Sequence, residues 1–526
     1  MSAINKKSSG ASRPRRTIIL MMAATLLAKV LGLLRTVLLA SSYGTGLEAA
    51  AFAEASVIPL TVFDMLLGAA IPGSFIPVYN RLLAREGTKR ADDFAQRFVN
   101  IILLFCVLLA GLGIVFSPQL ISILAPGLSG NAQKLASELL RIMFPMIIFT
   151  GGAYTLTGIM QSKGRYLLPA LISAISNAGV IIYLAFINPL LGENGIYGLA
   201  AAYVISWLIQ LATLVIPLAF SGKERFLLSP AAGIRDSELP AALKSAPPVM
   251  IGAWLMPATL LLGTAFSSLS DTDGGISVFT YAYNVYLMIT GILTYSICNY
   301  VFPELSRLSG SGDDEGFMNT LRRGFDSALM LTVPFTAAVF ILSGCGVSVM
   351  YQRGAFGAES AAATASALRF IVPAMPAFAV IELLNRAFYS KGLDKIPMIA
   401  AICGIASDAV VSAVLIFSGA VPVLSGAAAG ACAGQLVTAA ALLFAASKKM
   451  KGLFDGFIKR TWNLWLGAIL SAGVMSVVYR LFDINPFSNS FAGNLIICFA
   501  VFLPGAAVYL AVMKIGSKYV VGTLKW

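Results

Sequence analysis

The chain has 526 residues, of which 58% are hydrophobic and only 12% are charged, and its formal net charge is +13. A water-soluble protein of this length would not have that balance, so the composition indicates a protein that crosses a membrane many times. There is no histidine, which removes the usual general base and the commonest metal ligand. The six cysteines form no CxxC pair, and we expect neither a metal site nor a disulfide framework.

Apolar runs recur from one end of the chain to the other and predict an all-α protein with about fourteen transmembrane helices. Their centres lie near Val30, Leu60, Leu108, Ile148, Gly179, Leu208, Pro257, Met288, Pro334, Pro376, Asp408, Gln435, Gly473 and Val501. Roughly thirty Lys and Arg residues fall in the connections on one side and about three on the other. This asymmetry argues against nucleic acid as the partner and predicts that both termini are cytoplasmic.

An internal repeat relates the two halves of the chain. Ser162-Lys163-Gly164 reappears as Ser390-Lys391-Gly392, and Arg141 with Pro145 reappears as Arg369 with Pro373, at an offset of 228 residues. Pro77 with Arg81 reappears as Pro303 with Arg307, at an offset of 226 residues. Six predicted helices separate equivalent points, so the halves share one orientation in the membrane, and a parallel repeat of this kind predicts two six-helix lobes around a substrate cavity. The expected boundaries are a tail at 1–16, lobes at 17–225 and 226–450, and two further helices with a tail at 451–526.

The first predicted helix carries two cations, Lys29 and Arg35, far from either of its ends. A cation in hydrocarbon costs at least about 2.5 kcal/mol, so such a residue normally faces a partner or a water-filled cavity. Two cations favour an anionic substrate, and an arginine can bind a phosphate group bidentately. Snorkelling or a structural ion pair is the alternative. The equivalent helix of the second lobe, near Pro257, has no charge.

Carboxylates in other predicted helices are further candidates. Glu54 and Asp64 flank Pro59 in the second helix, and either could pair with the cations of the first helix and exchange for phosphate, or form a permanent structural pair. Asp408 stands alone in the eleventh helix, where an ionised carboxylate is costly. It is therefore expected to be protonated, paired or bound to Na⁺ or H⁺ as a coupling site.

The remaining intramembrane charges are open between local and functional roles. Glu382 and Arg386 have the i, i+4 spacing of a local ion pair, and a gating or coupling role is the alternative. Arg353, in an outer loop, is a candidate gate for the external mouth. Arg141 and Arg369 are expected to snorkel to the outer interface. The acidic pairs in the loops, such as Asp92 with Asp93, are interpreted as solvated, so no enzyme active site is predicted.

With these residues in view, the chain resembles the MurJ/MviN lipid II flippases, which are related to MATE exporters and polysaccharide flippases. The resemblance covers essentially the whole chain and is carried by motifs in the first helix and its following turn, at the end of the second helix, in an outer loop and in the tenth helix. These motifs are Ala28-Lys29-Val30-Leu31-Gly32-Leu33-Leu34-Arg35-Thr36 with Tyr43-Gly44-Thr45-Gly46, Gly73-Ser74-Phe75-Ile76-Pro77, Gln352-Arg353-Gly354-Ala355-Phe356, and Asn385-Arg386-Ala387-Phe388-Tyr389-Ser390 with Asp394 and Pro397.

Three departures from the family pattern bear on the substrate. The chain has Ala50 where many members carry Asp, Phe63-Asp64 where they carry Arg-Arg, and Ala282-Tyr283-Asn284 where they carry Ala-Asp-Arg or Ala-Asn-Lys. The resemblance thus implies Asn284 as a substrate contact. Several cavity cations of the family are absent, which leaves the headgroup chemistry open.

The resemblance implies a transporter of the bacterial cytoplasmic membrane that moves lipid II, the undecaprenyl-diphosphate-linked peptidoglycan precursor, to the outer leaflet by alternating access. The alternatives are a flippase for another lipid-linked oligosaccharide and a cation-coupled MATE-like drug exporter. The expected substrate contacts are Lys29, Arg35, Glu54, Asp64 and Asn284. No cofactor is expected beyond Na⁺ or H⁺ coupling and the membrane potential. The expected partners are the anionic lipid-linked substrate and membrane lipids, with a monomeric transporter that could contact the cell-wall synthesis machinery.

Overall fold

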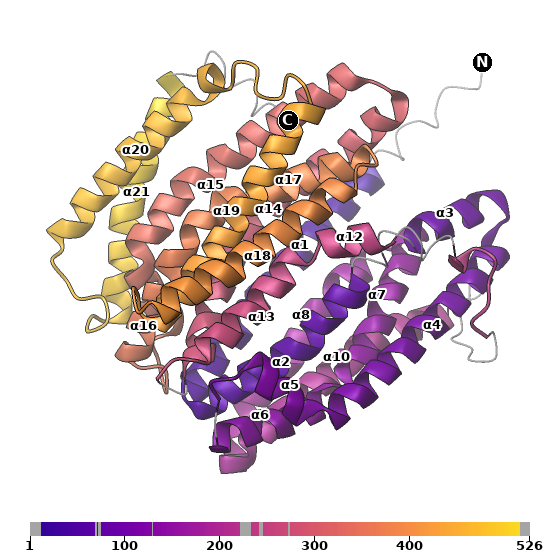
Figure 1. Cartoon of the computed structure of the whole chain (residues 1–526), viewed down its shortest axis with the longest axis horizontal. Coiled ribbons are helices and arrows are strands. Elements are labelled where there is room, and N and C mark those ends of the chain that lie inside the picture. The colour runs from indigo at the N-terminus through magenta and orange to yellow at the C-terminus, as the bar shows by residue number, and fades with distance from the viewer. Residues whose placement is uncertain are drawn as a thin grey trace. The chain divides into compact units, whose positions relative to one another are not determined.

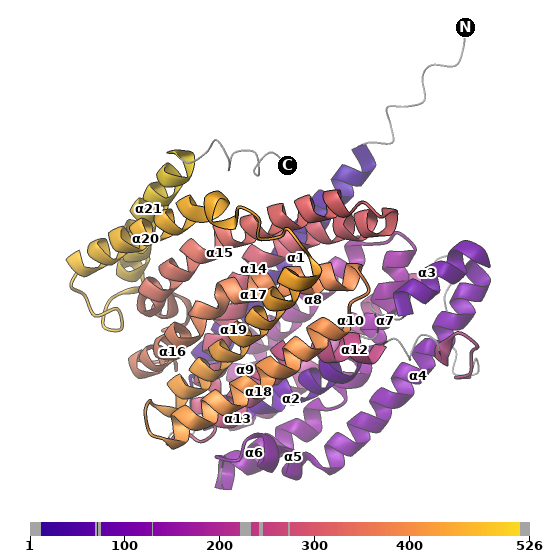
Figure 2. The same cartoon turned by 45° about the horizontal axis from the view of Figure 1, so that its top comes forward.

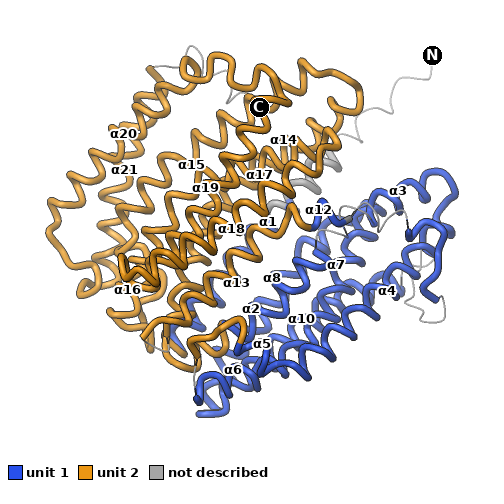
Figure 3. The backbone as a smooth tube through the Cα atoms, viewed as in Figure 1, with its two compact units in different colours: residues 1–42, 54–122, 130–250 blue, residues 43–53, 123–129, 251–526 orange. Residues whose placement is uncertain are grey.

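The computed structural model describes residues 12–68, 71, 75–128, 130–220, 233–240, 246–271 and 274–515. Figure 3 shows two compact units, unit 1 with residues 1–42, 54–122 and 130–250 and unit 2 with residues 43–53, 123–129 and 251–526. The predicted lobe boundaries at 225 and 450 stay predictions. The described residues contain helices and no strand, which confirms the all-α fold class.

The helices in the first half of the chain (Figures 1 and 2) are α1 (Ser12–Tyr43), α2 (Leu47–Phe63), α3 (Ile76–Arg85), α4 (Thr88–Val115), α5 (Ser117–Leu124), α6 (Gly130–Met143), α7 (Met146–Ser162), α8 (Leu167–Ile182), α9 (Asn188–Leu191), α10 (Gly195–Ala219) and α12 (Ala246–Gly252). Those in the second half are α13 (Leu255–Ser267), α14 (Gly275–Ser311), α15 (Asp314–Tyr351), α16 (Ala358–Ile371), α17 (Met375–Ser390), α18 (Lys395–Phe417), α19 (Val423–Lys449), α20 (Phe457–Leu481) and α21 (Phe491–Ile515).

Each predicted span centre lies in a different helix, from Val30 in α1 to Val501 in α21. Among the described residues, 11 helices are long and apolar enough to cross a membrane, or up to 12 if α6 and α7 form one bent span. The count of fourteen is therefore not confirmed. In this number, residues Leu167–Ala219, from α8 to α10, are included as a single span. The chain nevertheless folds back on itself within these residues. Gln210 donates to Ser176 Oγ over 2.7 Å, and Tyr183 donates to the Gly195 carbonyl over 2.7 Å.

The repeat predicted from the sequence is visible in how the helices break. In unit 1, α6 and α7 meet at Pro145 with a bend of 41°. In unit 2, α16 and α17 are separated by a single 3-10 turn, Val372–Ala374, that contains Pro373. Proline interrupts both helices because it has no N–H to donate to the preceding turn.

The arginines next to these breaks make the same hydrogen bond in both units. Arg141 of α6 donates from Nε to Ser117 Oγ over 2.9 Å, and Arg369 of α16 donates from Nε to Ser343 Oγ over 2.6 Å. Ser117 and Ser343 are themselves related by the repeat offset. The expectation that both arginines only snorkel is therefore incomplete, since each one ties its helix to a neighbouring helix through a serine.

Two helices of unit 2 pack unusually closely because they meet at glycines. A side chain at Gly430 of α19 would come within 1.9 Å of Ser412 Oγ on α18, and one at Gly434 would come within 2.9 Å of the Asp408 β-carbon. Interfaces of small residues let helix backbones approach in membranes, where there is no hydrophobic force to drive helices together. The close approach buries Asp408 against α19.

Candidate functional site

The two cations of the first helix occupy different surroundings in unit 1. Lys29 is exposed, whereas the Arg35 guanidinium carbon lies 5.4 Å from the centre of the Tyr203 ring on α10. The buried Nε of Arg35 has no hydrogen-bond partner among the described residues. Helix α1 is held in place nearby by Asn177 of α8, which donates to the Ala28 carbonyl over 3.2 Å. Arg35 is thus positioned by an aromatic face and keeps a donor available for an anion.

The second helix changes from α-helical to π-helical winding at Asp64, one of the predicted candidate residues. Helix α2 contains Pro59 and passes at Asp64 into a π-helical turn, Asp64–Gly68. Such turns are frequent at functional sites. Asp64 is exposed, and its helix is anchored by Phe63, whose ring meets Tyr154 edge-on at 5.3 Å. Glu54 of the same helix is completely buried. The exchange of partners between these carboxylates and the cations of the first helix stays a prediction.

Asn284 stands out on α14. From Gly275 to Tyr286 nearly every residue of this helix is buried in unit 2, and Asn284 is the exposed exception between the buried Tyr283 and Val285. Its amide therefore points away from the core of the unit, as a substrate contact requires. Its role as a substrate contact stays a prediction.

Asp408 lies at the centre of a buried polar cluster in unit 2. Its side chain is fully buried, and Ser412 Oγ donates to its Oδ1 over 3.4 Å. The Thr259 hydroxyl of α13 lies nearby, but neither Thr259 Oγ1 nor Asp408 Oδ2 has a hydrogen-bond partner among the described residues. Two buried oxygens without partners are costly in a dry interior. The role of Asp408 as a coupling site for Na⁺ or H⁺ stays a prediction.

Gln435 of α19 adds a further polar group to the same helix pair. Its Oε1 accepts a hydrogen bond of 2.5 Å from Tyr286, while its Nε2 has no partner among the described residues. A group of three or more His, Cys, Asp or Glu residues that could hold a metal is absent from the described part of the chain.

The other predicted charges have local partners. Arg386 forms the expected ion pair with Glu382 one turn earlier, and its guanidinium carbon lies 5.8 Å from the centre of the Tyr295 ring. Arg353 donates to the Met350 carbonyl over 3.1 Å and lies 5.7 Å from the Phe491 ring centre. It thereby satisfies a carbonyl at the C-terminal end of α15, where a cation also complements the helix dipole. Gating by either residue stays a prediction.

Two of the short motifs meet in unit 2. The turn Tyr43–Gly46, after α1, lies against the loop Gln352–Phe356. A side chain at Gly44, whose φ is +59°, would come within 2.4 Å of the Ala355 carbonyl oxygen, so only glycine fits there. The next residue, Thr45, shares a hydrogen bond of 2.7 Å with Ser360 Oγ, and Ser277 donates to the Thr45 carbonyl over 3.1 Å. This contact ties the end of the first helix to α14 and α16 at the predicted outer side.

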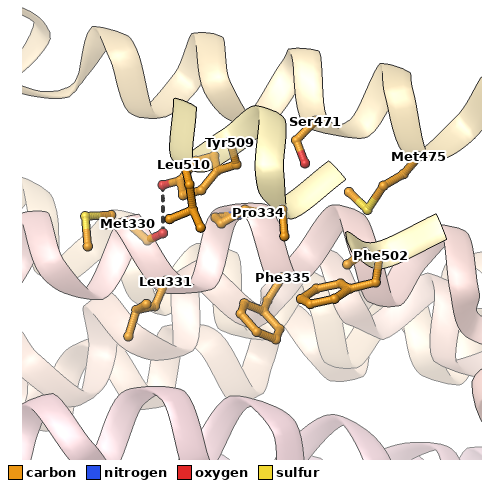
Figure 4. Close-up of a pocket in the computed structure, with 11 residues that line it drawn as sticks. Met330, Leu331, Pro334, Phe335, Ser471, Met475, Phe502, Tyr509 and Leu510 are labelled. Atoms are coloured by element: carbon orange, nitrogen blue, oxygen red, sulfur yellow. Dashed lines mark hydrogen bonds between the residues drawn. The ribbon is translucent and has the colours of Figure 1, made fainter. Parts of the chain in front are cut away.

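The last two helices form an apolar groove against α15. The pocket there has a volume of about 240 Å³. Its lining residues, drawn in Figure 4, are Met330, Leu331, Pro334, Phe335, Ala338, Ser471, Met475, Phe502, Ala506, Tyr509 and Leu510. Pro334 has no N–H for the carbonyl four residues earlier, that of Met330. Tyr509 supplies the missing donor over 2.8 Å. The proline and the tyrosine together fix α21 to α15 and leave a lining that is almost wholly apolar.

A segment between α10 and α12 was not singled out by sequence. Asp236 is covered completely by Arg90 and Arg97 of α4, whose Nη1 atoms lie 2.8 and 2.9 Å from its Oδ2. Burial by itself raises the pKa of this carboxyl, but the hydrogen bonds from Arg90, Glu238 N–H and Arg97 outweigh burial and lower its pKa.

The interpretation of Asp92 as a solvated loop residue is wrong, because it lies in α4, accepts from Tyr79 over 2.7 Å and pairs with Lys163 at 2.9 Å.

Comparison with known proteins decides which family has this arrangement. A family model described as "Lipid II flippase MurJ" matches residues 39–497. The chain belongs to the MurJ family. A protein named "Probable lipid II flippase MurJ" from Buchnera aphidicola subsp. Schizaphis graminum is 28% identical over 376 residues, which are 71% of this chain and 72% of that protein. A protein of the same name from Synechocystis is 28% identical over 391 residues, 70% of each chain.

Solved structures show the same fold. "Lipid II flippase MurJ, inward closed conformation" superposes with a TM-score of 0.76 at 24% identity and covers 96% of this chain and 100% of its own. An "inward-facing conformation of a multidrug resistance MATE family transporter of the MOP superfamily" gives a TM-score of 0.70 at 15% identity, covering 83% of this chain and 99% of its own. The fold is therefore common to MurJ and to MATE exporters, and the fold-class prediction is confirmed.

Of the predicted substrate contacts, Lys29, Arg35, Glu54 and Asp64 lie in unit 1 and Asn284 lies in unit 2, as does Asp408. Sequence reasoning missed Tyr509, Asp236 and the Ser117–Arg141 pair. Of these, only the contact of Tyr509 has a signal in the sequence. That signal is Pro334, since a proline within a helix leaves one carbonyl without its usual donor.

Proposed function

We propose that the chain is a lipid II flippase, which carries the undecaprenyl-diphosphate-linked precursor of peptidoglycan from the inner to the outer leaflet of the bacterial cytoplasmic membrane. The observation that carries this proposal is membership of the MurJ family over residues 39–497. The relatives named as probable lipid II flippases align with about seven tenths of the chain at 26–28% identity for several separate bacteria. The transporter would move its substrate without chemical change and work with both termini in the cytoplasm.

Arg35 and Lys29 are the groups proposed to hold the diphosphate. Arg35 is oriented by Tyr203 and retains a buried Nε without a partner among the described residues, and Lys29 is exposed on the same helix. A guanidinium binds phosphate through parallel hydrogen bonds, whereas an ammonium acts as a point charge. Asp64, Glu54 and Asn284 are proposed to line the path of the headgroup. An inside-negative potential favours outward movement of the anion, by about 2.3 kcal/mol per charge per 100 mV.

Asp408 is the proposed coupling site for Na⁺ or H⁺. It is the fully buried carboxylate of α18, and its free Oδ2 and the Thr259 hydroxyl are the ligands such an ion would need. The apolar groove of α15, α20 and α21 is proposed to take the polyprenyl tail of the substrate, since it is lined almost wholly by apolar side chains. We propose that the protein acts as a monomer that contacts the cell-wall synthesis machinery.

The alternative functions are a drug exporter and a flippase for another lipid-linked oligosaccharide. One observation supports them, namely that MATE exporters share the fold. A drug exporter of cations would prefer acidic and aromatic groups in its path, and Arg35 argues against it. A flippase for another lipid-linked oligosaccharide would use the same cations and differ in its headgroup contacts.

The experiment is complementation of a bacterium depleted of its essential lipid II flippase, at matched membrane levels of each variant. Wild type should restore growth, while Arg35→Ala and Lys29→Ala should not. The matched control is Arg85→Ala, an exposed arginine at the end of α3, which should restore growth. Failure of well-expressed wild type would overturn the lipid II assignment, and rescue by all variants would keep the assignment and overturn the site.

A further inference from the structure

Two cysteines of unit 2 lie against each other between α15 and α21. The thiol of Cys345 interacts with the thiol of Cys498 and with the hydroxyl of Tyr479 on α20. Cys345 is buried, Cys498 is half-buried, and both are free thiols. Both pack in a small apolar cluster with Ile497 and Val501 of α21. The transport sites proposed above use neither thiol.

A hydrogen bond one turn away fixes this pairing of thiols. Asn494 of α21 donates from Nδ2 to Ser348 Oγ of α15 over 2.7 Å. The hydrogen bond in the groove of Figure 4 joins a later part of α21 to an earlier part of α15, so the two helices run antiparallel. Cys498 follows Asn494 by four residues, and Cys345 precedes Ser348 by three. Residues at these spacings share a helix face, so the register of the two helices places the cysteines opposite each other.

A guanidinium lies beside the cysteine pair. Arg369 of α16 donates from Nε to Ser343 Oγ over 2.6 Å, two residues before Cys345, and its charge acts on the Cys345 thiol. The thiolate is the reactive form of a cysteine, and a neighbouring cation stabilises its negative charge. The equivalent arginine–serine contact of unit 1 has Gln119 at the position of Cys345. The contact therefore does not need a cysteine for its own geometry.

The pair lies near the predicted outer face of the membrane. Cys345 is six residues before the end of α15 at Tyr351, and Cys498 is seven residues after the start of α21 at Phe491. At a rise of 1.5 Å per residue, both lie about 10 Å from these helix ends. The distribution of Lys and Arg predicts that these ends face the outside, which is the oxidising side of the membrane. An oxidant from that side would meet the half-buried Cys498 first.

We propose that Cys345 and Cys498 are a reversible modification site, at which hydrogen peroxide forms a disulfide that joins α15 to α21. The Cys498 sulfur attacks the peroxide, an S–O bond forms, the O–O bond breaks and water leaves, which oxidises this sulfur to a sulfenic acid. The Cys345 sulfur then attacks the Cys498 sulfur, the S–S bond forms, the S–O bond breaks and a second water leaves. Two thiols and one peroxide thus give one disulfide and two waters. The inference does not depend on which substrate is transported.

The test is disulfide mapping by mass spectrometry. The purified full-length protein is treated with hydrogen peroxide and then alkylated under denaturing conditions. Wild type should yield a peptide pair linked through Cys345 and Cys498, and dithiothreitol should return both thiols. Cys345→Ser should give no linked pair and should leave a sulfenic acid on Cys498 that dimedone traps. The matched control is Cys403→Ser, which removes an exposed cysteine of α18 and should leave the linked pair unchanged.

The melting temperature shows whether the bond fits the native packing. Peroxide should raise the melting temperature of wild type by at least about 2 °C, because the bond restricts the unfolded chain, and should not raise that of Cys498→Ser. The proposal is overturned if Cys345 and Cys498 stay reduced while Cys403 is oxidised. It is also overturned if the mapped bond forms without raising the melting temperature. Both readouts on wild type are decisive even if a serine variant fails to fold.

Discussion

Replacing Asp408 is the most direct test of whether this buried carboxylate takes part in transport or has only a structural role. We expect Asp408→Asn to reduce flippase activity at least about tenfold, since the amide keeps the shape but cannot carry the charge of a bound cation. In purified wild type, NaCl should raise the melting temperature above that in matched choline chloride if the coupling ion is Na⁺, and Asp408→Asn should abolish that rise.

The control for this prediction is Ser412→Ala, which removes the long hydrogen bond of 3.4 Å to Asp408 and should cost far less activity. If the ion is a proton, Na⁺ should have no effect and the variant should instead lose the pH dependence of transport. Unchanged transport by Asp408→Asn, with unchanged Na⁺ and pH responses, would contradict the coupling site.

Asp236 gives a prediction for stability against pH. Its pKa is lowered in the folded protein by the hydrogen bonds from Arg90 and Arg97 that outweigh burial, while an unfolded Asp titrates near about 3.9. Its contribution should therefore be complete above about pH 4 and disappear as the pH falls through the lower, folded value. We expect Asp236→Asn to destabilise unit 1 by about 1–2 kcal/mol at pH 7.

Thermal unfolding of both proteins between pH 7 and the acid limit of folding measures this difference. It should stay constant from pH 7 to about pH 4.5 and shrink below that. The matched control is Glu238→Gln, because its ion pair with Arg81 is half exposed and is worth at most about 0.5 kcal/mol. A difference that grew as the pH fell would contradict the direction of the pKa shift.

At the scale of the elements, Tyr509 and Pro334 should be energetically coupled. Tyr509→Phe leaves the Met330 carbonyl without the hydrogen bond that it now accepts, at a cost of about 1–2 kcal/mol in the interior of the unit. In a Pro334→Ala background the helix supplies its own N–H to that carbonyl. The same tyrosine substitution should therefore cost less there, which a double-mutant cycle of melting temperatures measures. Equal costs in both backgrounds would show that Tyr509 stabilises α21 by packing alone.

The elements also show how far sequence reasoning reaches. Apolar runs predicted where helices form, and Pro145 and Pro373 predicted where two of them break, because both signals are local to the chain. Partners distant in sequence were not predictable. Nothing in the sequence near Pro334 indicates that Tyr509, 175 positions later, donates to the Met330 carbonyl. In the same way, nothing in α4 indicates that its arginines pair with Asp236. The candidate site residues were predicted from the energetic cost of placing a charge inside the membrane. That cost indicates that each charge needs an interaction partner, but it does not identify the partner.

Across the whole molecule, alternating access moves parts of the fold against each other, whereas a contact inside one compact unit does not have to open. Thr45 and Ser360 both lie in unit 2 and share a hydrogen bond of 2.7 Å between their hydroxyls, so cysteines at both positions would be close enough for a disulfide after small adjustments. Thr45→Cys with Ser360→Cys should therefore cross-link under oxidation and keep transport.

Each single cysteine should remain active under oxidising and under reducing conditions, and reduction should not change the rate of the double variant. If the Thr45–Ser360 cross-link formed fully and transport stopped until the bond was reduced, this contact would have to open in every cycle. The boundary between the moving parts would then run through unit 2 and not between the two units.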